Sequence, residues 1–300
     1  MPVPRVAVIT DSTSYLPTGW AAQWDIDVIP VQVIVAGQPF DETEDDQAQQ
    51  VAEALREWKP VTTSRPSPAR FLESYLRAQE AGATGIVVAT LSSSMSATFE
   101  SAVMAAKECE IPVEVVDTRS IAMGEGFPVV SGAQVARQGA DLQQVAAIIR
   151  ARAADSRVFF YVDTLEYLRR GGRVSAAKAA MGQALQVKPL LQVDDGHVER
   201  MEQVRTAGKA LARLADLAVE AAGDVPADIA VQHLGSPERA AALAQELRAR
   251  VPSADVVEGT VGGVVGAHVG PGMVAVVVSP RITDEQWVLK TGPSTPSMDT

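Results

Sequence analysis

The sequence has little of several residue types on which common protein classes depend. It contains one cysteine, Cys109, and aromatic residues make up 5% of the chain. A single cysteine excludes an internal disulfide framework and a thiolate metal cluster. No apolar run approaches the about 18–20 residues of a membrane-spanning helix, and the first residues lack the pattern of a signal peptide. We therefore expect a cytoplasmic protein without stable membrane insertion.

Positive charge is also scarce, since 26 Lys and Arg stand against 37 Asp and Glu, for a net charge of -11. A nucleic-acid-binding protein needs a basic surface to neutralise phosphates, so this class is disfavoured. The histidines His197, His233 and His268 are far apart in the sequence, which disfavours a transition-metal site. No Walker loop and no Gly-x-Gly-x-x-Gly after the first strand are present, so no metal or nucleotide cofactor is predicted.

The first half of the chain alternates short apolar runs with helical patterns. Residues 5–10 and 85–90 are typical of buried strands, and residues 26–35 predict a second strand bent at Pro30. In the segments between these runs, apolar residues recur at the spacing of an α-helix. This alternation predicts an α/β domain over residues 1–155, with a mostly parallel sheet and flanking helices.

The pattern changes after residue 155. Residues 187–204 predict two strands joined at an Asp-Asp-Gly turn, and a further apolar strand covers residues 273–280. Hairpins mixed with helices predict a second, α+β domain over residues 156–290 with a mixed or antiparallel sheet. The remaining residues, 291–300, are predicted to form a disordered tail.

Three segments of the first half concentrate hydroxyl side chains where strands end or helices begin. They are "ITDSTSYLP" (9–17), "VTTSRPSP" (61–68) and "ATLSSSMSAT" (89–98). In open α/β sheets the carboxyl ends of the strands form the ligand crevice, and helix N-termini there attract anions. Small hydroxyl donors could hold a carboxylate or phosphate. Serine and threonine are also ordinary helix caps, so a structural role is the simpler explanation of any one loop, whereas three such loops converging on one crevice favour an anion site.

Two segments of the second half carry further candidates for binding an anion. Residues 259–278 hold six glycines and His268, which either supplies a donor or is structural. Residues 168–174, "LRRGGRV", place arginines around a glycine pair, and guanidinium groups suit carboxylate or phosphate. Arginine is also common on surfaces, so both interpretations stay open.

Taken together, the motifs resemble those of the DegV family of bacterial fatty-acid-binding proteins. They are "VITDSTSYLP", "TTSRPSP", "LSSSMSATFESA", "VVDTRSIAMGEG", "YLRRGGRVS", "KPLLQVDDG" and "HVGPG", and they extend from about residue 6 to residue 278. The resemblance implies a two-domain protein that buries one long-chain fatty acid and has no other cofactor. It also implies a partner, a separate fatty-acid kinase that forms an acyl phosphate on the carboxyl group presented by the binding protein.

The resemblance also implies roles for individual residues. The carboxylate-binding serine of the family falls on Ser93, with Ser94 beside it. A second hydroxyl falls on Thr63, followed by Ser64, and the histidine near the carboxylate is His268. Arg170 and Arg173 are implied to face the phosphate or the kinase. The chain departs from the family pattern at Ser94 and Ala97, where glycine is usual, and at Arg65, where glutamine is frequent.

A serine hydrolase that uses Ser93 or Ser94 with His268 as base is the alternative from another class. It needs a base within hydrogen-bond reach of the nucleophile, and the sequence has no Gly-x-Ser-x-Gly motif around these serines. A fatty acid would instead require an aliphatic tunnel, each buried methylene contributing roughly 0.8 kcal/mol, and several donors for its charged end. The Ala-, Val- and Leu-rich helices could line such a tunnel.

Overall fold

The computed structural model describes residues 5–42, 46–174 and 187–282. Its N-terminal part is built on a parallel sheet with the strand order β2-β1-β6-β7. The strands are β1 (Val6–Asp11), β2 (Ile26–Ile29), β6 (Gly85–Thr90) and β7 (Val113–Asp117). A short 3₁₀ turn, η1 (Ser12–Ser14), follows β1. The parallel arrangement predicted for this half is confirmed.

Helices cover both faces of the parallel sheet, which is why β1 and β6 are almost continuously apolar. They are α1 (Trp20–Trp24), α3 (Pro68–Glu80), α4 (Thr98–Ala106), α5 (Met123–Arg137) and α6 (Leu142–Asp155). Residues of α5 and α6 pack on one face, around Val8 and Val87. Residues of α3 and α4 pack on the other, around Ile9 and Ile86. Neighbouring residues along each strand thus point to opposite faces of the sheet and pack into different hydrophobic cores.

The C-terminal part contains a mixed sheet with the order β10-β9-β8-β13-β11-β12. The strands are β8 (Arg157–Tyr161), β9 (Lys188–Asp194), β10 (His197–Val204), β11 (Ala227–His233), β12 (Asp255–Thr260) and β13 (Val274–Pro280). The helices are α7 (Glu166–Arg170), α9 (Ala207–Ala222), α10 (Pro237–Arg250) and α11 (Gly263–Val269). The predicted hairpin is present, with His197 opposite Asp194, and the mixed sheet is confirmed.

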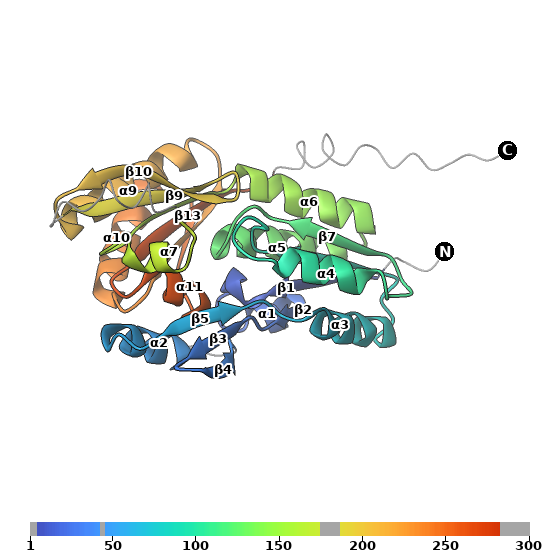
Figure 1. Cartoon of the computed structure of the whole chain (residues 1–300). Helices are drawn as coiled ribbons and strands as arrows, with labels where there is room; N and C mark the ends of the chain where they lie inside the picture. The colour runs from blue at the N-terminus through green and yellow to red at the C-terminus, as the bar shows by residue number, and fades with distance from the viewer. Residues whose placement is uncertain (1–4, 43–45, 175–186, 283–300) are drawn as a thin grey trace.

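A third, small sheet with the order β4-β3-β5 lies beside α11 (Figure 1). It consists of β3 (Gln32–Val35), β4 (Gln38–Asp41) and β5 (Val61–Ser64), and α2 (Asp46–Arg56) connects its last two strands. The single bent strand predicted over residues 26–35 is wrong, because the chain changes sheets at Pro30. Residues 61–64, predicted as a loop, form β5 by pairing with β3, a long-range contact that local sequence does not reveal.

The glycine-rich segment, residues 259–278, contains α11. Glycine is needed just before this helix, because a Cβ atom on Gly262 would lie 2.2 Å from Oε1 of Glu42. The close approach brings the helix against the N-terminal part of the chain.

The predicted boundary between two domains at residue 155 stays a proposal. The predicted tail, 291–300, lies outside the described residues.

Buried charge and a hairpin tip join the two large sheets. Arg152 on α6 is 6% exposed at its side chain and forms an ion pair with Asp228 on β11. At the other contact, the Ser92 hydroxyl donates to the Gly196 carbonyl at the β9–β10 turn, at 2.7 Å.

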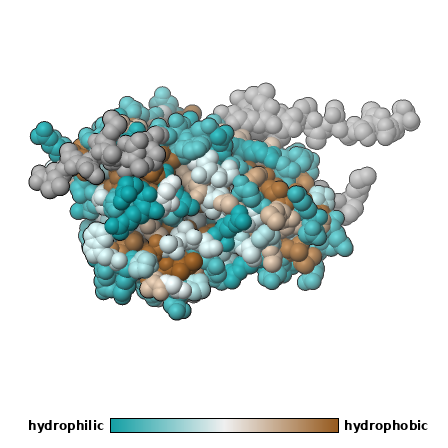
Figure 2. Space-filling view, viewed as in Figure 1, coloured by the Kyte–Doolittle hydropathy of each residue, from teal (hydrophilic) through white to brown (hydrophobic). Residues whose placement is uncertain are grey.

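Hydrophilic side chains cover most of the visible surface, with hydrophobic ones in separate groups (Figure 2). Among the helices of the described ranges, none is long and apolar enough to cross a membrane.

Candidate functional site

An apolar cavity of about 220 Å³ lies where the three sheets meet. Its walls come from β5, the loop after β6, the strands β8 to β10 and the helix α11. Most of its lining is aliphatic: Val31, Leu91, Met95, Ile121, Val158, Leu168, Val193, Val198, Val261, Val264, Val265, Val269, Met273 and Ala275, with the ring of Phe160. Such a lining favours a hydrocarbon ligand, because an apolar wall stabilises a bound ligand mainly by burying its methylene groups away from water.

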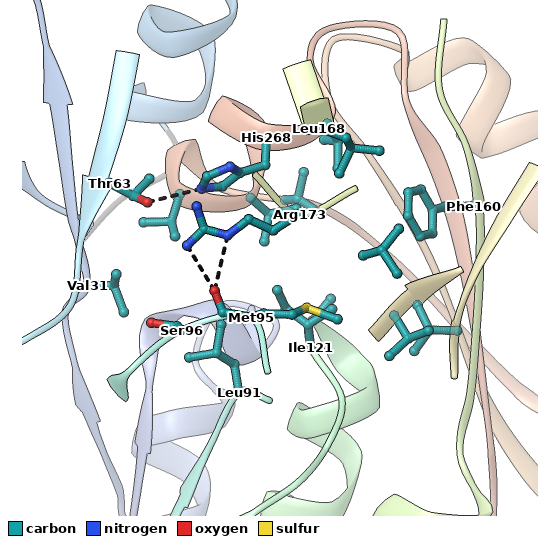
Figure 3. A pocket seen from close by; sticks show the side chains of 18 of the residues that line it. Val31, Thr63, Leu91, Met95, Ser96, Ile121, Phe160, Leu168, Arg173 and His268 are labelled. Carbon is teal, nitrogen blue, oxygen red and sulfur yellow. Dashed lines mark hydrogen bonds between the residues drawn. The ribbon is translucent and has the colours of Figure 1, made fainter. Parts of the chain in front are cut away.

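Polar groups gather at one end of this cavity, opposite Phe160 (Figure 3). Oγ1 of Thr63, on β5, lies 3.0 Å from Nε2 of His268, on α11. The Arg173 guanidinium lies next to them and donates from Nε and Nη2 to the Met95 carbonyl, at 3.1 and 2.9 Å. The cavity therefore has a hydrocarbon part and one end rich in hydrogen-bond donors.

The loop after β6 is folded largely by its own hydroxyl groups. The Ser92 carbonyl accepts from the amides of Met95 and Ser96, which closes a turn. Ser93 donates from its hydroxyl to Asp117, at 2.5 Å, and its amide donates to the same carboxylate. The serine density thus stabilises a tight turn, and this turn directs the Met95 carbonyl toward Arg173.

Ser96 is the serine of this loop that lines the cavity. It stands between two carbonyls that each accept from an arginine, Met95 from Arg173 and Ala97 from Arg65, the latter at 3.3 Å. Arg65 is exposed at the rim, and within the described part of the chain no carboxylate forms a salt bridge with either arginine. The Ser96 hydroxyl itself pairs with the Thr98 hydroxyl at 2.9 Å, and the carbonyls on either side of Ser96 are each bonded to a cation.

His268 is electrically neutral near pH 7. Burial, and secondarily the positive charge of Arg173, lowers the pKa of its imidazole from 6.5 to about 4. Its Nδ1 atom is buried without a hydrogen-bond partner in the described structure, and Gly171 packs against it. A Cβ atom at position 171 would lie 2.1 Å from Nδ1, so the glycine fixes how deeply the ring can sit.

The structure brings together some of the predicted site residues. Thr63, Ser64, Arg173 and His268 line the cavity. Ser93 and Ser94 are not among its lining residues: Ser93 is paired with Asp117, and Ser94 is exposed beside the hairpin tip. A carboxylate-binding role for these two serines stays a prediction that the geometry does not favour.

Arg170 lies away from the cavity, on the outer side of α7. Its Nε atom donates to Glu166 at 2.7 Å, and its guanidinium stacks over the exposed Trp58 ring at 5.2 Å from the centroid. A contact with a phosphate or a kinase stays a prediction for Arg170. The position is on the surface, so the prediction concerns a partner protein more than the bound ligand.

Ser96 and Arg65 are the polar lining residues that were not assigned to the site from the sequence. Ser96 belongs to the same hydroxyl-rich loop, and only the turn closed at Ser92 decides which serine faces inward. Arg65 was noted as a departure from the family pattern, but its sequence position alone does not place it at the rim.

In the described ranges, no group of three or more His, Cys, Asp or Glu residues could hold a metal ion.

Comparison with known proteins decides the family. The model described as "Uncharacterised protein, DegV family" matches residues 5–281. The chain belongs to the DegV family. A DegV domain-containing protein of Streptomyces coelicolor is 48% identical over 278 residues, which cover 92% of this chain and 99% of the relative. The protein DegV of Bacillus subtilis is 32% identical over 278 residues, 91% and 98% of the two chains.

Solved structures of DegV proteins share the whole fold. A DegV family protein from Thermus thermophilus, described by its fatty-acid binding, superposes with a TM-score of 0.87 at 30% identity, covering 92% of this chain and 100% of the other. DegV from Bacillus subtilis, described as a fatty-acid-binding protein, gives a TM-score of 0.84 at 30% identity, covering 93% and 100%. The fold described above is therefore shared with these DegV proteins.

Proposed function

We propose that this protein binds a long-chain fatty acid in the apolar cavity and, in the cytoplasm, presents its carboxyl group to a separate fatty-acid kinase. In this role it is a carrier and not itself an enzyme. The observation that carries the proposal is the cavity's division into an aliphatic part and one donor-rich end. The two DegV structures described as fatty-acid-binding support the ligand class.

The donor set suits a single carboxylate. A charged group is costly to bury unless several donors replace its water. In this proposal the Thr63 hydroxyl, the Ser96 hydroxyl and the neutral His268 ring contact the carboxylate, while Arg65 and Arg173 supply positive charge on either side. The acyl chain then extends toward Phe160 through the valine-lined part of the cavity.

The kinase part of the proposal rests on accessibility at the donor-rich end. Arg65 is exposed and still lines the cavity, so this end opens to the surface, where a partner could reach the carboxyl group. A phosphoryl group transferred there would add negative charge between the two arginines. Mixing the loaded protein with a fatty-acid kinase and ATP should give an acyl phosphate, and no product should form without the kinase.

Native mass spectrometry tests the ligand directly. Protein purified from a bacterial host should retain one fatty acid, which denaturation releases for identification. Retention of polar metabolites alone, with no lipid, would contradict the proposal. Ser96→Ala should retain less fatty acid than Ser93→Ala. Ser101→Ala is the matched control, because the Ser101 hydroxyl is buried without a partner in the described structure and lies outside the cavity lining.

The serine-hydrolase alternative lacks its central contact. Ser93 donates to Asp117, while the Nε2 atom of His268 is paired with Thr63, so the nucleophile and the base are each engaged elsewhere. A fluorophosphonate probe should leave Ser93 unlabelled. Labelling that His268→Asn abolishes would restore the hydrolase.

A further inference from the structure

Glu42 lies buried at the junction of the small sheet and α11, with a dense set of donors. It is 7% exposed. Its Oε1 atom accepts from the Val264 amide at 2.8 Å and from the Tyr15 hydroxyl at 3.1 Å. Its Oε2 atom accepts from the Ser12 hydroxyl at 2.6 Å. A carboxylate can accept all three bonds at once.

The same contacts continue to the wall of the cavity. The Tyr15 hydroxyl accepts from the Val265 amide at 3.0 Å, and the Ser12 hydroxyl accepts from the Val31 amide at 3.1 Å. The Glu42 amide itself donates to the Val31 carbonyl at 2.9 Å. Val31, Val264 and Val265 all line the cavity. One carboxylate therefore links two walls that are far apart in the sequence.

On its other side Glu42 borders a groove, although little of its side chain is exposed. It lines a separate groove of about 880 Å³ between the N-terminal and C-terminal parts, together with Ser12, Tyr15 and Gly262. The other titratable residues lining this groove are His233 and Glu258, and no lysine or arginine is among its described lining residues. Protons can thus reach Glu42 without passing through the apolar cavity.

We propose that Glu42 is a positioning residue for the cavity: its carboxylate holds Val31 and the first turn of α11 in the arrangement that accepts a ligand, and protonation releases them. A protonated carboxyl must itself donate, so its bond with the Ser12 hydroxyl has to reverse direction, and the bonds from the Val264 amide and the Tyr15 hydroxyl lose the negative charge that strengthens them. α11 also carries His268, so loosening its first turn disturbs the donor-rich end as well. The inference rests on the proposed function, because it concerns occupancy of the same cavity.

The surroundings of Glu42 place its protonation near neutral pH. Burial raises the pKa of Glu42 to about 7, although the bonds from Ser12, Val264 and Tyr15 oppose the rise, and the negative charge of Asp11 adds to it. Tyr15 stays protonated, since burial raises its pKa as well. Burial lowers the pKa of His233, which also lines the groove.

The test uses a ligand that cannot titrate. Binding of 1-hexadecanol and of palmitic acid to the full-length protein is measured from pH 6 to pH 8. If only the ionised form of Glu42 is competent, hexadecanol affinity falls about tenfold from pH 8 to pH 6, following the ionised fraction. Glu42→Gln keeps an oxygen for the Val264 amide but cannot titrate, so its profile is flat. The controls Glu258→Gln and His233→Asn keep the wild-type profile.

A measurement without ligand separates this inference from the proposed function. In amide NMR spectra of the ligand-free protein, the Val31, Val264 and Val265 signals should titrate together near pH 7 in the wild type and not in Glu42→Gln. Signals that do not move, or that move equally in the variant, overturn the role of Glu42 whether or not a lipid binds. If neither ligand binds at any pH while these signals titrate, the proposed function fails and the role of Glu42 in positioning these walls stands.

Discussion

Thr63 and His268 are 205 positions apart in the sequence, yet their side chains lie 3.0 Å apart across the polar end of the cavity. β5 supplies one and α11 the other, so the contact exists only when the small sheet has docked on the C-terminal part. A substitution at either residue therefore tests both the proposed binding site and the assembly of the fold.

Replacing Thr63 tests the value of this contact. Thr63→Val keeps the β-branched shape but removes the hydroxyl, so we expect fatty-acid affinity to fall about 3- to 10-fold, the usual worth of one hydrogen bond. Competition binding with a fluorescent fatty acid measures it. Thr62→Val is the matched control, because Thr62 is exposed on the same strand and does not line the cavity. Equal losses in both variants would remove Thr63 from the site.

A side chain at position 171 should displace the His268 ring. Gly171→Ala would place a methyl group 2.1 Å from Nδ1, and the backbone there has an ordinary negative φ, so the effect is steric. We expect at least about a tenfold loss of fatty-acid affinity, because the donor-rich end depends on that ring. Gly208→Ala, which has no atom within 4 Å of the added Cβ, should bind normally. Normal binding by Gly171→Ala would contradict the assignment.

Two buried groups should give stability opposite dependences on pH. The pKa of Glu42 is raised from 4.5 to about 7 in the folded protein, so its contribution is complete below pH 4.5 and is lost as pH rises through 7. The pKa of His268 is lowered from 6.5 to about 4, so its contribution is present above pH 6.5 and is lost as pH falls toward 4.

Thermal unfolding of single variants separates these contributions. From pH 5 to pH 8 the free energy of unfolding of Glu42→Gln should rise relative to that of the wild type, by on the order of 3 kcal/mol at most. The melting temperature of the variant should rise relative to the wild type in the same direction. His268→Asn should lose less stability than the wild type between pH 6.5 and pH 4. A constant offset from the wild type at every pH, in either variant, would show that the group does not titrate in this range.

The hydrocarbon end should set which acyl chains fit. The Phe160 ring stands opposite the polar groups, so Phe160→Leu enlarges the cavity there (Figure 3). We expect the variant to shift toward longer or bulkier chains when offered an equimolar fatty-acid mixture, at a cost of about 1–3 kcal/mol in stability. Mass spectrometry of the retained lipid gives the answer; an unchanged chain distribution would mean that another residue limits chain length.

The sequence predicted the large features well because they depend on local patterns. Buried strands such as β6, the Asp194–His197 hairpin and the change from a parallel to a mixed sheet all follow from periodicity and turn residues. The small sheet was missed because β5 becomes a strand only through pairing with β3. The choice of Ser96 over Ser93 depends on one turn closed at Ser92, which neighbouring serines make indistinguishable in sequence.

Glu42 illustrates what no motif could have indicated. It stands in an acidic stretch of the sequence, and its partners Ser12, Tyr15 and Val264 come from segments near both ends of the chain. A carboxylate with this much burial is placed by tertiary packing, and only the structure shows what it holds.

The break at Pro30 also limits how the molecule can admit its ligand. β2 ends at Ile29 in the parallel sheet and β3 begins at Gln32 in the small one, with Val31 on the cavity wall between them. An extended chain spans at most about 3.5 Å per residue, so the two sheets cannot part at this corner. The small sheet is tied a second time where β5 ends at Ser64 and α3 begins at Pro68, so any widening of the cavity beside Thr63 must leave both corners in place.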